Sequence, residues 1–235
     1  MLFFYIRHGD PIYEPDSLTE LGLKQADALA KRLALFGLDR IYASSSNRAI
    51  LTAKPTCDLL NKDMEILDFA NEHYTRQEFD IVRDGKSRWL YQDEEARLLF
   101  ADEAILSLGQ NWYEHPEMRA YQKGIERIRR EAKQFFMGLG YEHIENSGKY
   151  KVIKPSDERV AFFAHHGFGM AFLSVILGIP YPRFANHFDM THTGMTVIEF
   201  KEEMGYAIPR VLTLSSDSHL YSEGMPTKYN NRLFF

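Results

Sequence analysis

The chain begins with a short apolar run that stops abruptly at a basic triplet. Residues 2–6 read LFFYI, and Arg7, His8 and Gly9 follow directly. The run has the length and aromatic enrichment of a β-strand. It does not alternate with polar residues, which predicts a strand buried on both faces, as in a parallel sheet. A fold that starts this way needs helices to cover both faces of its sheet.

Helix and strand patterns alternate along the first part of the chain. Residues 17–37 carry apolar side chains at helical spacing, with Ser17 and Glu20 resembling a capping box and Gly37 as the stop. The next three segments predict a strand, a helix and a strand: 40–44, 47–61 and 64–69. This alternation predicts an α/β fold with three layers, α/β/α, around a mostly parallel central sheet.

The pattern is interrupted between about 73 and 115, where charged and aromatic residues mix without a clean period. We interpret this segment as a partly helical insertion that forms a lid or cap, within a single domain spanning 1–235. Regular patterns return afterwards and predict a helix, a hairpin turning at Asn146-Ser147-Gly148, a strand, a helix and two strands: 116–140, 141–155, 159–164, 171–178, 195–200 and 210–214.

The composition excludes several classes of function. The chain has 28 Lys and Arg against 33 Asp and Glu, a net charge of −5, which offers no long-range attraction for nucleic acid or anionic lipid. No window reaches the roughly 18 apolar residues of a membrane span. Cys57 is the only cysteine, which excludes an internal disulfide and is typical of a reducing cytosol. We therefore expect a soluble, cytoplasmic protein with no nucleic-acid or membrane partner.

Basic residues follow two strands of the predicted sheet. The first strand runs into Arg7 and His8, and the strand at 159–164 runs into His165 and His166. Because ligands of open α/β sheets bind beyond the carboxyl ends of the strands, these side chains are expected to share one crevice.

A further contribution comes after the second strand. Ser44 and Arg48 stand at the start of the predicted second helix, whose free backbone N–H groups favour an anion. Arginine holds phosphoryl oxygens with two-pronged hydrogen bonds at fixed charge, and a neutral imidazole can attack phosphorus. These residues predict a phosphoryl-transfer site in which Arg7 and Arg48 bind the phosphate and His8 is the nucleophile.

Four motifs, in this order, resemble those of the histidine phosphatase superfamily, which has the phosphoglycerate mutase-like fold. They are Arg7-His8-Gly9, Leu18-Thr19-Glu20-Leu21-Gly22, Ser44 through Arg48-Ala49 with Thr52-Ala53, and a late strand ending in His165. The resemblance covers roughly 1–72 and 158–200. It implies that His8 becomes phosphorylated while Arg7, Arg48 and the helix end near Ser44 hold the phosphoryl group.

The resemblance also implies a second catalytic histidine and an acid. The preceding strand and the distance forward to Gly178 favour His165 as that histidine, whereas direct adjacency to glycine favours His166. The family's acid follows the third strand, which indicates Glu72, with Glu78 as the alternative. One departure is the stretch 10–13, Asp-Pro-Ile-Tyr, where many members have Thr and then Asn.

The predicted function is a metal-independent phosphatase that hydrolyses a small organic phosphomonoester through a phosphohistidine, without a cofactor. A phosphoglycerate-type mutase with the same intermediate is the alternative, and a non-catalytic phosphate-sensing or protein-binding module is the alternative of another class. His187, Asp189 and His192 could share an ion, but their spacing lacks a third histidine and we expect no metal there. Substrate identity and oligomeric state stay open.

Overall fold

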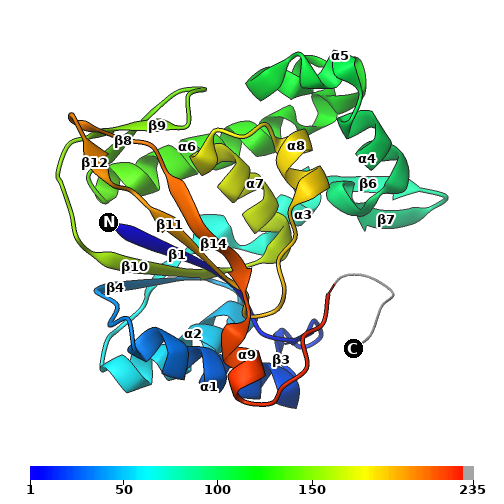
Figure 1. Cartoon of the computed structure of the whole chain (residues 1–235). Coiled ribbons are helices and arrows are strands. Elements are labelled where there is room, and N and C mark those ends of the chain that lie inside the picture. The colour runs from blue at the N-terminus through cyan, green and yellow to red at the C-terminus, as the bar shows by residue number, and fades with distance from the viewer. Residues whose placement is uncertain (230–235) are drawn as a thin grey trace.

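A central sheet of six strands, ordered β14-β11-β1-β10-β4-β5, runs through the computed structural model, which describes residues 1–229 (Figure 1). Strands β1, β10, β4 and β5 are parallel, whereas β11 and β14 run antiparallel to their neighbours. The strand bounds are Leu2–Arg7 for β1, Arg40–Ser44 for β4, Glu65–Leu67 for β5, Arg159–Ala164 for β10, Met195–Glu199 for β11 and Arg210–Ser216 for β14. The sheet is thus mostly parallel, as predicted.

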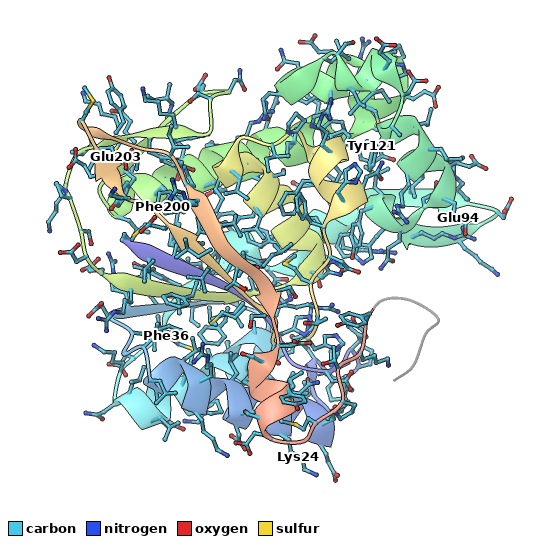
Figure 2. All side chains as sticks on the ribbon, viewed as in Figure 1. Lys24, Phe36, Glu94, Tyr121, Phe200 and Glu203 are labelled. Atoms are coloured by element: carbon cyan, nitrogen blue, oxygen red, sulfur yellow. The ribbon has the colours of Figure 1, made fainter. Side chains whose placement is uncertain are left out.

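Helices cover both faces of this sheet, which confirms the three-layer α/β/α architecture (Figure 1). Phe4 and Ile6 of β1 pack on the side of α1 (Glu20–Ala34) and α2 (Asn47–Leu60). Phe3 and Tyr5 pack on the side of α6 (Gln122–Gly138) and α7 (His166–Leu177). Burial on both faces is the physical reason why the opening run does not alternate with polar residues. Figure 2 shows the two layers, with Phe36 on the first side and Phe200 on the second.

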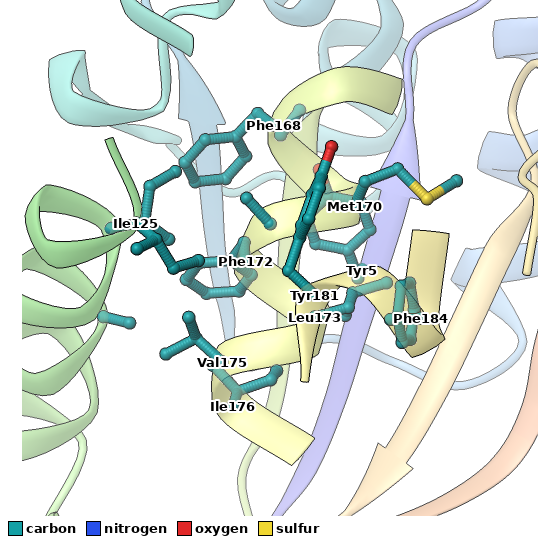
Figure 3. Close-up of a cluster of buried hydrophobic side chains, with 14 of the residues drawn as sticks. Tyr5, Ile125, Phe168, Met170, Phe172, Leu173, Val175, Ile176, Tyr181 and Phe184 are labelled. Carbon is teal, nitrogen blue, oxygen red and sulfur yellow. The ribbon is translucent and has the colours of Figure 1, made fainter. Parts of the chain in front are cut away.

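Helix α7 lies at the centre of the larger apolar layer and is hydrophobic all round (Figure 3). Phe172 stacks on Tyr5 of the sheet with 5.9 Å between ring centroids, and Phe168 packs edge-on against Phe162. Helix α8 (Tyr181–His187) and α6 cover its remaining sides. A helix buried in this way is rigidly placed, so the residues at its N-terminus are held at a fixed position beyond β10.

The first helix begins later than the sequence predicts. Thr19, rather than Ser17, is the N-cap, and its hydroxyl accepts from the N–H of Gly22 at 3.0 Å. Residues Ser17–Leu18 form a short strand, β3, that pairs with β2 (Pro11–Ile12). The capping box at Ser17 is therefore wrong, because pairing with β2 holds its backbone extended outside the helix.

Two later elements also differ in detail from the predicted pattern. The segment at 116–140 starts as a 3₁₀ helix, η4 (Pro116–Tyr121), before α6 begins. The predicted hairpin is present as β8 (Tyr141–Ile144) and β9 (Lys149–Val152), and β13 (Tyr206–Ala207) and β12 (Glu202–Glu203) extend it to a second sheet of four strands. The third predicted strand is shorter, since β5 ends at Leu67 and the 3₁₀ turn η1 (Asp68–Ala70) follows.

The segment at 73–115 folds into short helices and one hairpin beside α7 and α8 (Figure 1). Its buried rings pack on Tyr181 of α8, with centroid distances of 5.1 Å for Phe79 and 5.3 Å for Trp112. Its elements are α3 (Glu72–Glu78), β6 (Asp80–Arg83), β7 (Lys86–Trp89), η2 (Leu90–Gln92), α4 (Glu94–Phe100), α5 (Glu103–Leu106) and η3 (Gly109–Glu114). The described chain closes with α9 (Ser218–Ser222), and none of its helices has the length and apolar run that a membrane crossing requires.

Candidate active site

Side chains from four elements meet beyond the carboxyl ends of the parallel strands. His8 follows β1, His165 follows β10, Arg48 lies in the first turn of α2 after β4, and Glu72 is the first residue of α3. These four and Arg7 are each at most 9% exposed. The rings of His8 and His165 lie 5.2 Å apart between centroids. The structure thus brings together the set that the sequence predicted at one sheet edge.

The imidazole of His8 is fixed in one tautomer. Its Nδ1 lies 2.7 Å from the carbonyl oxygen of Gly9, which can only accept, so Nδ1 carries the proton and Nε2 keeps a lone pair. Burial, helped by His165 and Arg7, lowers the pKa of His8 well below its ordinary value. A neutral ring with a free Nε2 lone pair is the form that acts as a nucleophile.

The backbone of the Arg7-His8-Gly9 turn is held tightly. The N–H of His8 donates to the carbonyl of Ala164 at 3.0 Å, and that of Gly9 donates to the Thr52 hydroxyl at 3.0 Å. A Cβ on Gly9 would lie 2.7 Å from the carbonyl oxygen of Gly22, in the first turn of α1. Glycine is required because helix α1 approaches the turn this closely.

His165 is held by hydroxyl groups from two strands. Its Nε2 lies 2.8 Å from the Ser44 hydroxyl, and its backbone carbonyl accepts from the Tyr5 hydroxyl at 2.6 Å. Its Nδ1 lies 3.6 Å from Oε2 of Glu72. Burial lowers the pKa of His165 to about 4, so this ring is also neutral near pH 7. Ser44, predicted as a phosphate contact, lies against His165.

The start of helix α2 differs from the prediction. Ser44 is the last residue of β4, and Ser46 is the N-cap. The first backbone N–H group of the helix belongs to Asn47 and has no acceptor within the helix. It donates to the Asp16 carboxylate at 2.7 Å. The prediction that this helix end near Ser44 offers free N–H groups to a phosphate is therefore wrong at Asn47, because Asp16 already supplies the anion there.

Each of the two arginines is oriented by two acceptors. Arg7 donates from Nη1 to the Met190 carbonyl at 2.5 Å and from Nη2 to Nε2 of His192 at 2.7 Å. Arg48 pairs through Nη1 with Asp16 at 2.7 Å and through Nη2 with Glu72 at 3.1 Å. Both guanidinium groups are buried beside His8, so their charge acts in a poorly screened environment.

Glu72 links the second arginine to helix α7. Its Oε1 accepts from the N–H of Gly167 at 2.8 Å, while Oε2 pairs with Arg48. Burial opposes ionisation, but the neighbouring His165, Arg48 and the Gly167 N–H together hold the pKa of Glu72 below its ordinary value. The carboxylate is therefore ionised in this arrangement.

The two alternative residues occupy different surroundings. Glu78 pairs with Arg127 of α6 through both carboxylate oxygens, at 2.6 and 2.7 Å. His166 starts α7, with Nε2 2.8 Å from Asp189 and Nδ1 3.3 Å from the Tyr91 hydroxyl. The structure thus places Glu72 and His165, rather than Glu78 and His166, next to the ring of His8.

A pocket of about 390 Å³ opens in front of His8. Its wall includes Trp89 of the insertion, which the sequence offered as a residue of a substrate lid or of the packing between insertion and body. It also includes groups that the sequence did not single out as part of the site: Asp10, Pro11, Tyr13, Tyr91, Gln92, His192 and Lys228. His192 comes just before β11, an antiparallel strand whose start therefore lies at the carboxyl end of β1. A prediction that this strand runs antiparallel to β1 would have placed His192 at the site.

One group of side chains in the described part of the chain has the arrangement of a metal site. Ligand atoms of His8, Glu72 and His165 all lie within 4.8 Å of one another. Imidazole and carboxylate are ligands for Zn²⁺ and similar ions, but Arg7 and Arg48 place positive charge beside them. Two of the residues considered as ligands in the sequence have other partners, since Asp189 lies against His166 and His192 against Arg7.

The chain is similar in fold to several solved structures over nearly its whole length. A phosphoserine phosphatase from Entamoeba histolytica is 17% identical, with a TM-score of 0.58 over 93% of this chain and 98% of that one. A mycobacterial glucosyl-3-phosphoglycerate phosphatase in complex with VO3 is 17% identical, with a TM-score of 0.59 over 92% and 99%. A putative alpha-ribazole-5'-P phosphatase from Escherichia coli is 18% identical, with a TM-score of 0.58 over 92% and 98%.

A family model adds evidence from the sequence itself. The model of the histidine phosphatase superfamily (branch 1) matches residues 4–95, a range that contains Arg7, His8, Arg48 and Glu72. No curated protein matches the chain. The family match over residues 4–95 confirms the predicted resemblance for this part of the chain, which is similar to the histidine phosphatase superfamily (branch 1). The solved structures show that the fold is shared over nearly the whole chain.

Proposed function

We propose that this protein is a phosphatase that hydrolyses a small organic phosphomonoester through a phosphohistidine at His8. The observation that carries the proposal is the neutral His8 ring, whose Nε2 has no hydrogen-bond partner among the described residues and faces a pocket also lined by Arg7 and Glu72. The relatives with this fold include a phosphoserine phosphatase and a glucosyl-3-phosphoglycerate phosphatase, which supports the same class of substrate.

In the first half-reaction, Nε2 of His8 attacks phosphorus, and the bond from phosphorus to the ester oxygen breaks. Arg7 and Arg48 neutralise the phosphoryl oxygens, and His165, in the position next to His8, stabilises the group in transfer. The departing alkoxide takes a proton from Glu72, which takes up that proton from solvent when the substrate binds. The substrate's own negative charge and its competition for Arg48 raise the proton affinity of this carboxylate when the site is filled.

In the second half-reaction, Glu72, now ionised, accepts a proton from water. The hydroxide attacks phosphorus, the bond to Nε2 breaks, and His8 recovers its lone pair with release of inorganic phosphate. Asp10 and Glu72 line the pocket together with Lys228, so its charge is mixed. A mutase needs a closed, positively lined pocket to return the phosphate to its substrate, and this mixed lining therefore favours hydrolysis. The single cysteine is the ground for proposing a cytoplasmic location.

The test is hydrolysis of p-nitrophenyl phosphate by the wild type and by His8→Ala, with excess chelator present. We expect chelator-resistant activity in the wild type and a complete loss in His8→Ala, with a similar melting temperature for both. Rapid quench of the wild type is expected to trap an acid-labile, base-stable phosphoryl group. Equal activity of both proteins would refute the nucleophile, and phosphate binding without turnover on any phosphomonoester would favour the non-catalytic module. Transfer between phosphoglycerates without release of phosphate would favour the mutase.

A further inference from the structure

His192 lies beside Arg7 in the loop that leads into β11. Its Nε2 is 2.7 Å from Nη2 of Arg7, while the carbonyl of Met190, two residues earlier, accepts from Nη1. A guanidinium group can only donate hydrogen bonds, so His192 accepts with the lone pair of Nε2. Two fixed acceptors from one loop therefore hold the planar head of Arg7 in a single orientation.

The other side of the His192 ring lies against Asp10. Burial, followed by the charge of Arg7, lowers the pKa of His192 to about 3, so the ring is neutral and its proton is on Nδ1. That nitrogen is 3.4 Å from Oδ1 of Asp10. Asp10 is itself anchored, since its Oδ2 accepts from the Thr19 hydroxyl at 2.8 Å and its N–H donates to Gln25 at 2.8 Å.

We propose that Asp10 and His192 form a positioning pair that fixes the guanidinium of Arg7 for the phosphoryl group. The inference rests on the proposed function. The chain of contacts runs from α1 through Asp10 and His192 to Arg7, and Nε of Arg7 has no hydrogen-bond partner among the described residues. His192 acts through Arg7 in this arrangement. It accepts a hydrogen bond from one N–H group of the guanidinium, and this contact fixes the directions in which the remaining N–H groups point.

The ring of His192 also lines the pocket and lies 5.8 Å from the ring of His8. A direct contact with the substrate is therefore the competing role, and the two roles differ in one respect. A positioning residue loses its effect when Arg7 is absent, whereas a residue that touches the ligand keeps it.

The experiment measures the binding of inorganic phosphate and of vanadate by calorimetry in a double-mutant cycle of His192→Phe and Arg7→Met. Phenylalanine keeps a flat ring without the acceptor, and methionine keeps the aliphatic stem of the arginine. His192→Gln keeps an acceptor near the position of Nε2. The matched control is His143→Phe, because His143 is another partly buried imidazole and packs at a tilt on Tyr150 near the other end of α7.

We expect His192→Phe to weaken oxyanion binding and to lower kcat/KM for p-nitrophenyl phosphate by about tenfold to a hundredfold, the range for losing a hydrogen bond to a charged group. His192→Gln is expected to recover most of this loss, and His143→Phe to resemble the wild type. In the Arg7→Met background, His192→Phe is expected to weaken binding less than threefold. If the Arg7→Met protein does not fold, as judged by its melting curve, the comparison of His192→Phe with His192→Gln tests the positioning role.

Three outcomes would overturn the inference. An equal loss from His192→Phe with and without Arg7 would show that His192 touches the ligand itself. Wild-type binding and turnover in His192→Phe, or no recovery in His192→Gln, would remove the positioning role while leaving the phosphatase proposal intact. A wild-type protein that neither binds an oxyanion nor hydrolyses a phosphomonoester would refute both proposals together.

Discussion

Replacing Glu72 by glutamine tests whether this carboxyl is the proton donor to the leaving group. Glutamine has nearly the same shape and keeps an acceptor for the N–H of Gly167, which lies 2.8 Å from Oε1. The change removes the proton that the mechanism transfers and the charge that faces Arg48 at 3.1 Å. Arg48 keeps a second carboxylate, Asp16, at 2.7 Å, so the buried cation is not left alone.

The expected effect on rate depends on the leaving group. A general acid contributes about 10²-fold to 10⁴-fold when the leaving group is a poorly stabilised alkoxide. Glu72→Gln is therefore expected to lower kcat/KM by about that amount for an alkyl ester such as glycerol 2-phosphate. With p-nitrophenyl phosphate, whose leaving group departs without a proton, the loss is expected to be about tenfold or less in this first step. The free energy of unfolding is expected to fall by about 2 kcal/mol, less than for a fully orphaned buried charge.

The assay compares kcat/KM for the two esters in the wild type, Glu72→Gln and the control Glu78→Gln. Glu78 forms a partly buried ion pair with Arg127, so its variant loses an ion pair of similar burial outside the pocket. The reasoning is refuted if Glu72→Gln slows both esters by the same factor, or if Glu78→Gln shows the dependence on leaving group instead.

Three further predictions follow from the same geometry. His165→Ala is expected to lower kcat by several orders of magnitude and His166→Ala by far less, because the His165 ring lies next to His8, with 5.2 Å between ring centroids. A larger loss in His166→Ala would exchange the roles of the two histidines. The folded pKa of His165 is depressed from 6.5 to about 4, so the unfolded chain binds the extra proton. The melting temperature is expected to fall as the pH drops through that window and to fall less in His165→Gln; identical pH profiles would contradict this. Gly167→Ala is expected to raise KM and to destabilise by about 1–3 kcal/mol, since a Cβ there would lie 2.4 Å from the ring of Trp89, and unchanged kinetics would show that the ring moves freely.

Local sequence patterns were sufficient for the architecture and for most of the candidate site. The unbroken run at 2–6 predicts a strand buried on both faces, and its residues from Phe3 to Ile6 are fully buried. Parallel strands share one carboxyl edge, so the sequence alone leads one to expect Arg7 and His8 beside His165 and His166. Such inferences succeed because strand burial and helix periodicity depend on near neighbours in the chain.

Tertiary structure decided the contacts that no local pattern encodes. His192 reaches Arg7 because β11 runs antiparallel to β1, and strand direction is set by the packing of the whole sheet. The Asp16 carboxylate accepts from the N–H of Asn47 at the start of α2, because the strand pair β2–β3 places the loop that carries Asp16 beside this helix end. The sequence favoured Glu72 over Glu78 only by resemblance, whereas the rotation of α3 turns the first toward Gly167 and the second toward Arg127. The order of residues along the chain is enough to predict which chemical groups gather at the edge of the sheet. Which of these groups touch depends on packing, because hydrogen-bond partners are set by distances between segments far apart in the chain.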